Sequence, residues 1–222
     1  MKLSDETLTI LKNYASINQN IQFKQGSTLS TFSPQKNILT IAQISENIPS
    51  TFAIYDLNKF LGALSLFHNP ELTVGEKHLK INGGGSELNY VCAEASMLHL
   101  PPEKTFEFPN PEIKFKMDKD DYDSCMKASQ ILSLPEFIVE GDGSKVFLVS
   151  TNTENNSSDE FRREVGTTDN EFKMIFKIEN IKLLSGNYNV EISSKGIAHF
   201  SYENSNLQYW IATEQKHSYY NG

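Results

Sequence analysis

The spacing of apolar residues predicts four helices in this chain, two in each half. From Ser4 onward, apolar residues recur at helical spacing while polar residues fill the opposite face, and Ser4 is a typical N-cap. A second helical pattern begins near Asp56, a third after Asp118, and a short fourth covers residues 179–184 and ends at Gly186. Since one face of each helix is expected to pack on a sheet, each helix is left with a polar face.

Between the helices, short segments of alternating apolar and polar residues predict antiparallel strands, separated by glycine and proline as in hairpins. Gly83, Gly84 and Gly85 lie between two such segments, which favours a hairpin turn over a phosphate-binding loop. The predicted strands are residues 21–23, 27–32, 38–44, 51–55, 71–74, 78–81, 88–93, 113–117, 136–140, 145–150, 160–165, 171–178, 188–193, 197–202 and 207–213.

The order of these elements repeats, although the residues themselves do not. Each half reads helix, four strands, helix and then three or more strands, which indicates a structural duplication. Four of the eight prolines lie within residues 101–111, which predicts an extended connector between domains. The sequence therefore predicts an α+β fold of two similar domains, residues 1–106 and 107–222, each with antiparallel sheets packed on two helices.

Composition narrows the range of functions. The 222 residues carry a net charge of −8, with only two arginines, so a protein that coats nucleic acid over its whole surface is excluded. Any nucleic-acid contact must be confined to a smaller face. No apolar run is long enough to span a bilayer, and no signal peptide is recognisable. Cys92 and Cys125 lie in segments that resemble core, which fits a reducing cytosol.

The sequence contains little that suggests bond chemistry. The five histidines are scattered, the two cysteines do not form a Cys-x-x-Cys pair, and no nucleotide-binding or hydrolase motif is present. We therefore expect no enzyme, no metal and no cofactor. One acidic cluster resembles the carboxylates of a metal-dependent nuclease, although helix capping and solvation are the favoured interpretation. It consists of Asp118, Asp120, Asp121 and Asp123.

Lysines on the predicted helices are a candidate nucleic-acid surface. Spacing alone favours the simpler interpretation, in which these lysines only solvate the helix surfaces. If all four helices faced one surface, the lysines would form a modestly positive lining that contacts phosphates without reading bases. The residues concerned are Lys12, Lys59, Lys119, Lys127 and Lys182.

Two stretches of the chain resemble the sliding clamps of T-even-type bacteriophages. Residues 1–18, with MKLS at the start and LKNYASIN at the end, resemble the beginning of that family, and residues 53–66 resemble its second helix. Looser likenesses lie at residues 108–109, 127–129 and 186–188, and the length and element order agree over the whole chain.

The resemblance implies a DNA polymerase processivity factor that forms a closed homotrimeric ring of six similar domains, with helices lining the hole. Two domains per chain require three chains for such a ring. Edge strands would pair head to tail between subunits, by analogy at residues 160–166 and 97–106. A duplex inside the ring would be retained topologically, whatever its sequence.

The resemblance also assigns residues to the hole. Lys12, Lys127 and Lys182 match basic positions of the family. Asp5 and Gln130 stand where basic residues are expected, which implies a less positive lining than in the T-even clamp. The full set of expected DNA-facing residues is Lys12, Asn13, Lys59, Lys119, Lys127 and Lys182.

Members of the family bind the polymerase through a short terminal peptide, in a hydrophobic pocket near the connector, and the ATP-driven clamp loader uses the same face. The resemblance also implies a role in late transcription and a location in the cytoplasm of the infected host. Our candidates for the pocket are also typical of ordinary core and linker anchors. They are Phe106, Phe108, Pro109, Tyr209 and Ile211.

Two alternatives to the ring remain open from the sequence. One is a DNA-associated processivity or scaffold protein of the same fold that forms no ring and holds DNA by charge alone. The other is a metal-dependent nuclease that uses the acidic cluster.

Overall fold

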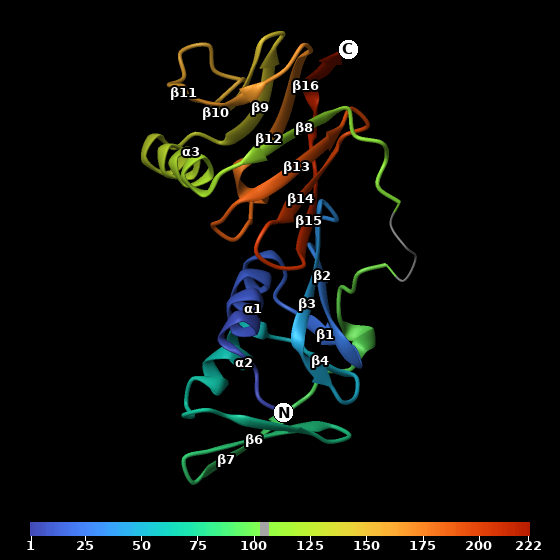
Figure 1. Ribbon diagram of the computed structural model, residues 1–222. Coiled ribbons are helices and arrows are strands. Elements are labelled where there is room, and N and C mark those ends of the chain that lie inside the picture. The colour runs from blue at the N-terminus through green and yellow to red at the C-terminus, as the bar shows by residue number, and fades with distance from the viewer. Residues whose placement is uncertain (103–106) are drawn as a thin grey trace. The chain divides into compact units, whose positions relative to one another are not determined.

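The computed structural model describes residues 1–102 and 107–222 and divides the chain into two compact units, Met1–Thr105 and Phe106–Gly222 (Figure 1). We call them the N-terminal and C-terminal units. Antiparallel strands dominate both, and the described residues form three α-helices. The predicted α+β class is therefore confirmed.

The two helices of the N-terminal unit begin where the sequence predicts. The hydroxyl of Ser4 caps α1 (Asp5–Ile17), and the carboxylate of Asp56 caps α2 (Leu57–Leu64), each accepting a backbone N–H three residues on. Figure 1 shows both helices on the same side of the neighbouring strands. Buried apolar residues on each helix form the face that packs on those strands.

The strands of the N-terminal unit form two small pairs and one three-stranded sheet. The two-residue turn between the last two strands has φ of 58° at Gly84 and 82° at Gly85, a conformation that favours glycine. The predicted hairpin is thus confirmed. The pairs are β1 (Ile21–Phe23) with β4 (Phe52–Ile54) and β2 (Gly26–Phe32) with β3 (Ile38–Ile48), and the sheet is β5 (Glu71–Val74), β6 (His78–Gly83) and β7 (Ser86–Val91).

Aromatic rings occupy the middle of the N-terminal unit. Phe23 and Phe52 stack with ring centroids 4.5 Å apart, and Phe60 of α2 meets Phe23 edge to face at 6.1 Å. Tyr14 of α1 is fully buried, and this burial raises the pKa of its phenol. These contacts fix α1 and α2 against the strands, so the orientation of their polar faces is also fixed.

The C-terminal unit contains two sheets and one α-helix. A five-stranded sheet has the order β11-β10-β9-β12-β16, and β8, β13, β14 and β15 pair in that order in the second sheet. The elements are β8 (Ile113–Met117), α3 (Lys119–Leu132), β9 (Glu136–Asp142), β10 (Lys145–Thr151), β11 (Phe161–Thr167), β12 (Glu171–Lys177), β13 (Tyr188–Ser193), β14 (Ile197–Tyr202), β15 (Leu207–Ala212) and β16 (Glu214–Asn221).

The predicted fourth helix, residues 179–184, is wrong. Ile178–Asn180 form a single 3₁₀ turn, and no helix continues beyond it. Ile181 and Leu183 are buried while Lys182 between them is partly exposed, a period of two that is typical of extended chain. The apolar residues that suggested a buried helical face therefore belong to an extended segment.

Three tyrosine hydroxyls replace helical hydrogen bonds in this segment. Tyr122 donates to the carbonyl of Leu183 at 3.2 Å, and Tyr188 donates to the carbonyl of Leu184 at 2.6 Å. The N–H of Leu184 donates to the hydroxyl of Tyr209 at 3.4 Å. Because buried backbone groups need hydrogen-bond partners, these tyrosines make the non-helical path stable.

The final strand of the chain was also not predicted from the sequence. Residues 214–221 (EQKHSYYN) are mostly polar and show no apolar alternation. They form β16, which lies at an edge of the five-stranded sheet and pairs with β12 across a register shift between Lys173 and Ile175. None of the residues of β16 is fully buried, so hydrophobic patterning gives no signal for this strand.

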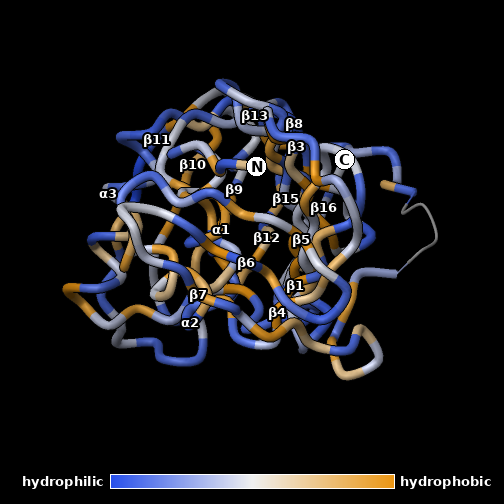
Figure 2. The backbone as a smooth tube through the Cα atoms, turned by 90° about the horizontal axis from the view of Figure 1, so that it is seen from below, coloured by the Kyte–Doolittle hydropathy of each residue, from blue (hydrophilic) through white to orange (hydrophobic). Residues whose placement is uncertain are grey.

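Hydrophobic and hydrophilic segments alternate along the backbone, as the orange and blue stretches of Figure 2 show. Among the described residues, no helix is long and apolar enough to cross a membrane. The apolar residues are instead used in short runs, each of which buries one face of a strand or helix.

The two N-caps provide a stability test. Asp56→Ala removes a cap hydrogen bond of 2.9 Å to the N–H of Lys59 and should cost about 1 kcal/mol of unfolding free energy. Asp118 occupies the N-cap of α3 but its side chain makes no cap hydrogen bond, so Asp118→Ala should cost less than half as much. Urea unfolding followed by circular dichroism measures both, and equal losses would contradict the assigned caps.

Candidate nucleic-acid interface

The polar face of α1 is exposed as the sequence predicts. Asp5, Thr9, Lys12 and Ser16 follow one another at intervals of three and four residues, and all are exposed. Lys12 also lines a hollow of about 320 Å³ between α1 and α2, together with Lys2 and several leucines. The N-terminal unit therefore presents a helix pair with lysine at the rim of an apolar groove.

A corresponding hollow of about 520 Å³ lies between α3 and the segment that follows β12 in the C-terminal unit. Lys127 and Gln130 line it from α3, and Lys182 lines it from the extended segment. The hydroxyl of Ser129 is buried there and has no hydrogen-bond partner among the described residues. The structure thus brings Lys127 and Lys182 to one groove, although Lys182 does not lie on a helix.

Lys119 is less available as a cation than the sequence suggests. Its ammonium donates to the carboxylate of Asp123 at 2.5 Å, and Ser185 donates to the same carboxylate at 2.8 Å. The hydrogen bond from Lys119 holds the pKa of the Asp123 carboxyl below its usual value. At neutral pH the pair is ionised and its two charges largely cancel.

Lys59 does not join Lys12. Lys59 lines a separate hollow of about 530 Å³ between α2 and β7, whereas Lys12 lines the groove between α1 and α2. Asn13 is partly buried on α1, next to Lys12. Of the six predicted DNA-facing residues, the structure groups Lys127 with Lys182, places Lys12 and Asn13 on α1, and separates Lys59.

Two of the four aspartates of the acidic cluster at the start of α3 are held in ion pairs. Asp121 accepts from Arg163 at 2.7 Å, and Asp123 is paired with Lys119. Within residues 1–102 and 107–222, no group of three histidine, cysteine, aspartate or glutamate side chains could hold a metal ion. The geometry therefore gives the nuclease alternative no support.

Tyr209 and Ile211 cannot line an open pocket in this structure, which corrects their predicted role. Both are 0% exposed, because successive residues of β15 alternate between the two faces of its sheet and these two face the core. Trp210, between them, faces the opposite side and is partly exposed. The alternation of residue types along β15 could be seen in the sequence. The sequence did not show which of the two faces packs on the core.

The start of the C-terminal unit instead meets that opposite face. The ring of Phe108 lies 5.5 Å from His199, which stacks on Trp210 at 4.8 Å with 9° between the planes. Pro109 is partly buried beside Phe108. Phe106, the remaining pocket candidate, lies outside the described residues.

His199 and Trp210 belong to a row of side chains that sequence reasoning missed. In register across β8, β13, β14 and β15 lie Lys114, Glu191, His199 and Trp210. Lys114 donates to Glu191 at 2.8 Å and is the main cause of the lowered pKa of that carboxyl. Cross-strand register is set by pairing between residues far apart in the sequence, so no local pattern indicates this row.

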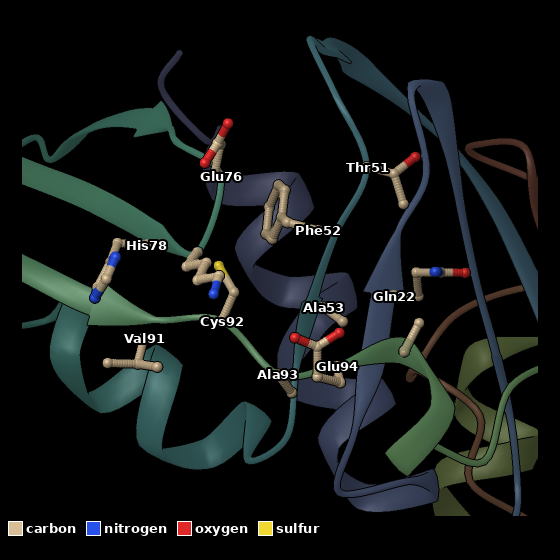
Figure 3. A pocket seen from close by; sticks show the side chains of 12 residues that line it. Gln22, Thr51, Phe52, Ala53, Glu76, His78, Val91, Cys92, Ala93 and Glu94 are labelled. Carbon is tan, nitrogen blue, oxygen red and sulfur yellow. The ribbon is translucent and has the colours of Figure 1, made fainter.

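A further hollow in the N-terminal unit, of about 400 Å³, is lined by residues that the sequence analysis did not select (Figure 3). In that view, the side chains of Phe52 and Cys92 lie between those of Glu76 and Glu94. Partial burial raises the pKa of the Cys92 thiol. The lining mixes apolar and charged groups, and none of the predicted site residues contributes to it.

Large apolar side chains are exposed at two places beside strands that end a sheet. The hollow between α2 and β7 is lined by three such side chains, those of Tyr55, Val91 and Met97. Their exposed fractions are 54, 67 and 64%. Ile131 and Leu132, at 68 and 42%, end α3, which packs against β11. Among the described residues β7 pairs only with β6, and β11 only with β10.

The predicted strand at residues 97–106 needs correction. Residues 97–102 contain no strand, and a 3₁₀ turn covers Ala95–Met97. Residues 103–106 lie outside the described part of the chain. In the described residues, the last strand of the N-terminal unit is β7.

Comparison with known protein families gives one match for each unit. The family described as "DNA polymerase processivity factor" matches residues 4–96. The family described as "gp45 sliding clamp, C terminal" matches residues 112–215. The two matches together leave only the connector region and short terminal stretches uncovered.

Curated relatives and solved structures agree with these matches. The sliding clamp of Vibrio phage KVP40 is 34% identical over 222 residues, covering 96% of this chain and 99% of the relative. That of Enterobacteria phage T4 is 28% identical, covering 99% and 100%. The fold matches A. fulgidus PCNA, solved with the C-terminal region of FEN-1, at a TM-score of 0.71 and 16% identity, covering 94% of this chain and 95% of that one. PCNA from Thermococcus kodakaraensis gives 0.68 at 15%, covering 94% and 96%.

The lowered pKa of Asp123 predicts a pH-dependent contribution to stability. A depressed carboxyl pKa stabilises the fold above the unfolded value, here 3.8, and the contribution disappears as pH falls through the lower folded value. Asp123→Asn should therefore lower the urea midpoint at pH 7, and its difference from the wild type should shrink as the pH falls below about 4. Asp120→Asn removes the same charge from the same helix and is the control. A difference that is constant from pH 7 to pH 3 would disprove this role.

Proposed function

This chain belongs to the sliding-clamp family of T4-like phages, whose members are non-enzymatic DNA polymerase processivity factors, and we propose on that premise that three copies close into a ring around duplex DNA and tether the phage replicative polymerase. One observation carries the proposal. The chain contains two compact units of similar size, each with a lysine-bearing groove beside a helix. Six such units from three chains would surround a duplex on all sides.

The free sheet edges support head-to-tail association. Tyr55, Val91 and Met97 beside β7 form an exposed apolar surface, and Ile131 and Leu132 at the end of α3, the helix that packs against β11, form a second one. Exposed apolar side chains next to an unpaired strand edge favour pairing with another chain. In the proposed ring, the N-terminal unit of one copy meets β11 and α3 of the next.

The DNA contact that we propose is electrostatic and weak. Lys12, Lys127 and Lys182 would attract phosphates without reading bases, so binding should depend on salt and not on sequence. Three chains of net charge −8 carry −24, and acidic groups outside the hole would repel DNA from every other surface. Retention would come from ring closure, and the lysines would centre the duplex.

The proposed clamp would also bind partner proteins through a short peptide. A. fulgidus PCNA binds the C-terminal region of FEN-1, which supports capture of a terminal peptide by a clamp of this fold. We place the corresponding site beside Phe108, Pro109 and the exposed face that carries His199 and Trp210. Its occupants would be the polymerase, an ATP-driven clamp loader and the late-transcription machinery, inside the infected host cell.

Mass in solution tests the ring directly. Light scattering after size exclusion across a dilution series should give a species near 75 kDa, three times the 25.1 kDa of one chain. A 25.1 kDa species at every concentration would remove the topological mechanism. Binding by charge alone would then be the better account.

The lining is tested by reversing charge in both grooves. Lys12→Glu with Lys127→Glu should leave the fold intact, because both side chains are exposed, and should weaken salt-dependent DNA binding by about tenfold or more. The measurements are loading onto circular DNA and the length of processive synthesis. Lys36→Glu with Lys195→Glu makes the same charge change in two exposed hairpin turns and serves as the control. Equal processivity in the two double variants would refute the lining.

A further inference from the structure

The only two arginines of the chain are consecutive and lie in the edge strand β11. Because successive side chains of a strand point to opposite faces of its sheet, Arg162 and Arg163 extend to opposite sides. Each of them makes contacts with a different part of the C-terminal unit. The edge strand is therefore held from both faces.

On one face, Arg162 reaches across two neighbouring strands. Its guanidinium carbon lies 3.8 Å from the centre of the Phe147 ring on β10. Its Nη1 donates to Oε1 of Glu140 on β9 at 3.0 Å. Phe147 and Glu140 are directly opposite each other in the sheet, so the arginine side chain crosses β10 along one row of residues. Only a planar guanidinium can stack on the ring and donate a directed hydrogen bond at its edge.

On the other face, Arg163 ties β11 to the first turn of α3. Its Nε donates to Oδ1 of Asp121 at 2.7 Å. The Asp121 side chain is only 13% exposed, so the pair is better shielded from water than ordinary surface ion pairs, which contribute little to stability. A third ion pair, Lys145 with Glu164 at 2.6 Å, links β11 to β10 near its other end.

The pairing of β11 with β10 is irregular close to these contacts. The pairing of β10 with β11 shifts register between Val146 and Phe147, next to the ring that Arg162 covers. A register shift interrupts the hydrogen-bond ladder locally and leaves an edge strand less firmly attached. The contacts of the two arginines make up for part of the backbone hydrogen bonding that holds β11 to β10 and is interrupted there.

We propose that Arg162 and Arg163 are positioning residues for self-association, which hold β11 extended so that its free edge can pair with the N-terminal unit of a second copy. The inference rests on the proposed ring. A strand that is already ordered loses less conformational entropy on binding than one that must be ordered at that moment. Neither arginine needs to touch the partner, because both act through the shape of β11.

The test compares self-association with local order in the full chain. The variants are Arg162→Lys, which keeps the charge but removes the planar stack, and Arg163→Gln. Sedimentation equilibrium gives the monomer–trimer constant, and hydrogen exchange followed by mass spectrometry gives the protection of residues 161–167. Each variant should weaken the association constant by about tenfold or more and speed exchange in this segment to a similar extent.

The control is Lys116→Gln, which removes an exposed ion pair of 3.0 Å with Glu203 on the other sheet of the same unit. It should change neither readout. Unfolding midpoints measured on dilute monomer should be alike for Arg162→Lys and the control. If Arg162 had a purely structural role, Arg162→Lys would instead lower the midpoint below that of the control.

Two results separate the inference from the proposed function. A wild-type chain that stays monomeric at all concentrations overturns the ring and this inference with it. A wild-type trimer whose association constant is unchanged in both arginine variants overturns this inference and leaves the ring intact.

Discussion

A β-strand that is hydrogen-bonded along one side only leaves a row of unsatisfied N–H and C=O groups, and much of this structure can be understood as a response to that constraint. The strands at issue are β7 in the N-terminal unit and β11 in the C-terminal unit, each at the end of a sheet. Apolar side chains beside both strands remain exposed in the single chain. Pairing these edges between copies would satisfy the backbone groups and cover the apolar surface at once, and the proposed ring is one way to achieve both.

The helices are subject to a complementary requirement. Each α-helix buries one face on strands through apolar contacts such as those of Tyr14, Phe60 and Tyr122, and so must present its other face to the surroundings. Those faces carry a few lysines, some acidic residues and neutral polar groups. The same packing that stabilises each unit thus determines where charge is displayed, and no residue dedicated to bond chemistry is required.

Sequence patterns predicted the elements that local physics determines. The cap at Ser4, the start of α2 near Asp56, the hairpin at Gly84 and nearly all the strands follow from neighbouring residues, and the fold class followed from them. The helix predicted for residues 179–184 failed because its backbone groups bond to three tyrosines, of which Tyr122 and Tyr209 are distant in the sequence. Two features of the candidate site also depend on tertiary packing and leave no local signal. They are the burial of Tyr209 on the inner face of β15 and the separation of Lys59 from Lys12.

The pairing of Lys119 with Asp123 has a consequence for motion along DNA. An electrostatic contact that is strong must be broken each time a bound protein advances by one base pair, and this sets a barrier to each step. With the charge of Lys119 cancelled locally, the proposed ring would have fewer cations whose attraction to successive phosphates rises and falls along the duplex. The free-energy profile along the duplex would then be nearly flat. Viscous drag from water, and not the breaking of ion pairs, would limit one-dimensional diffusion.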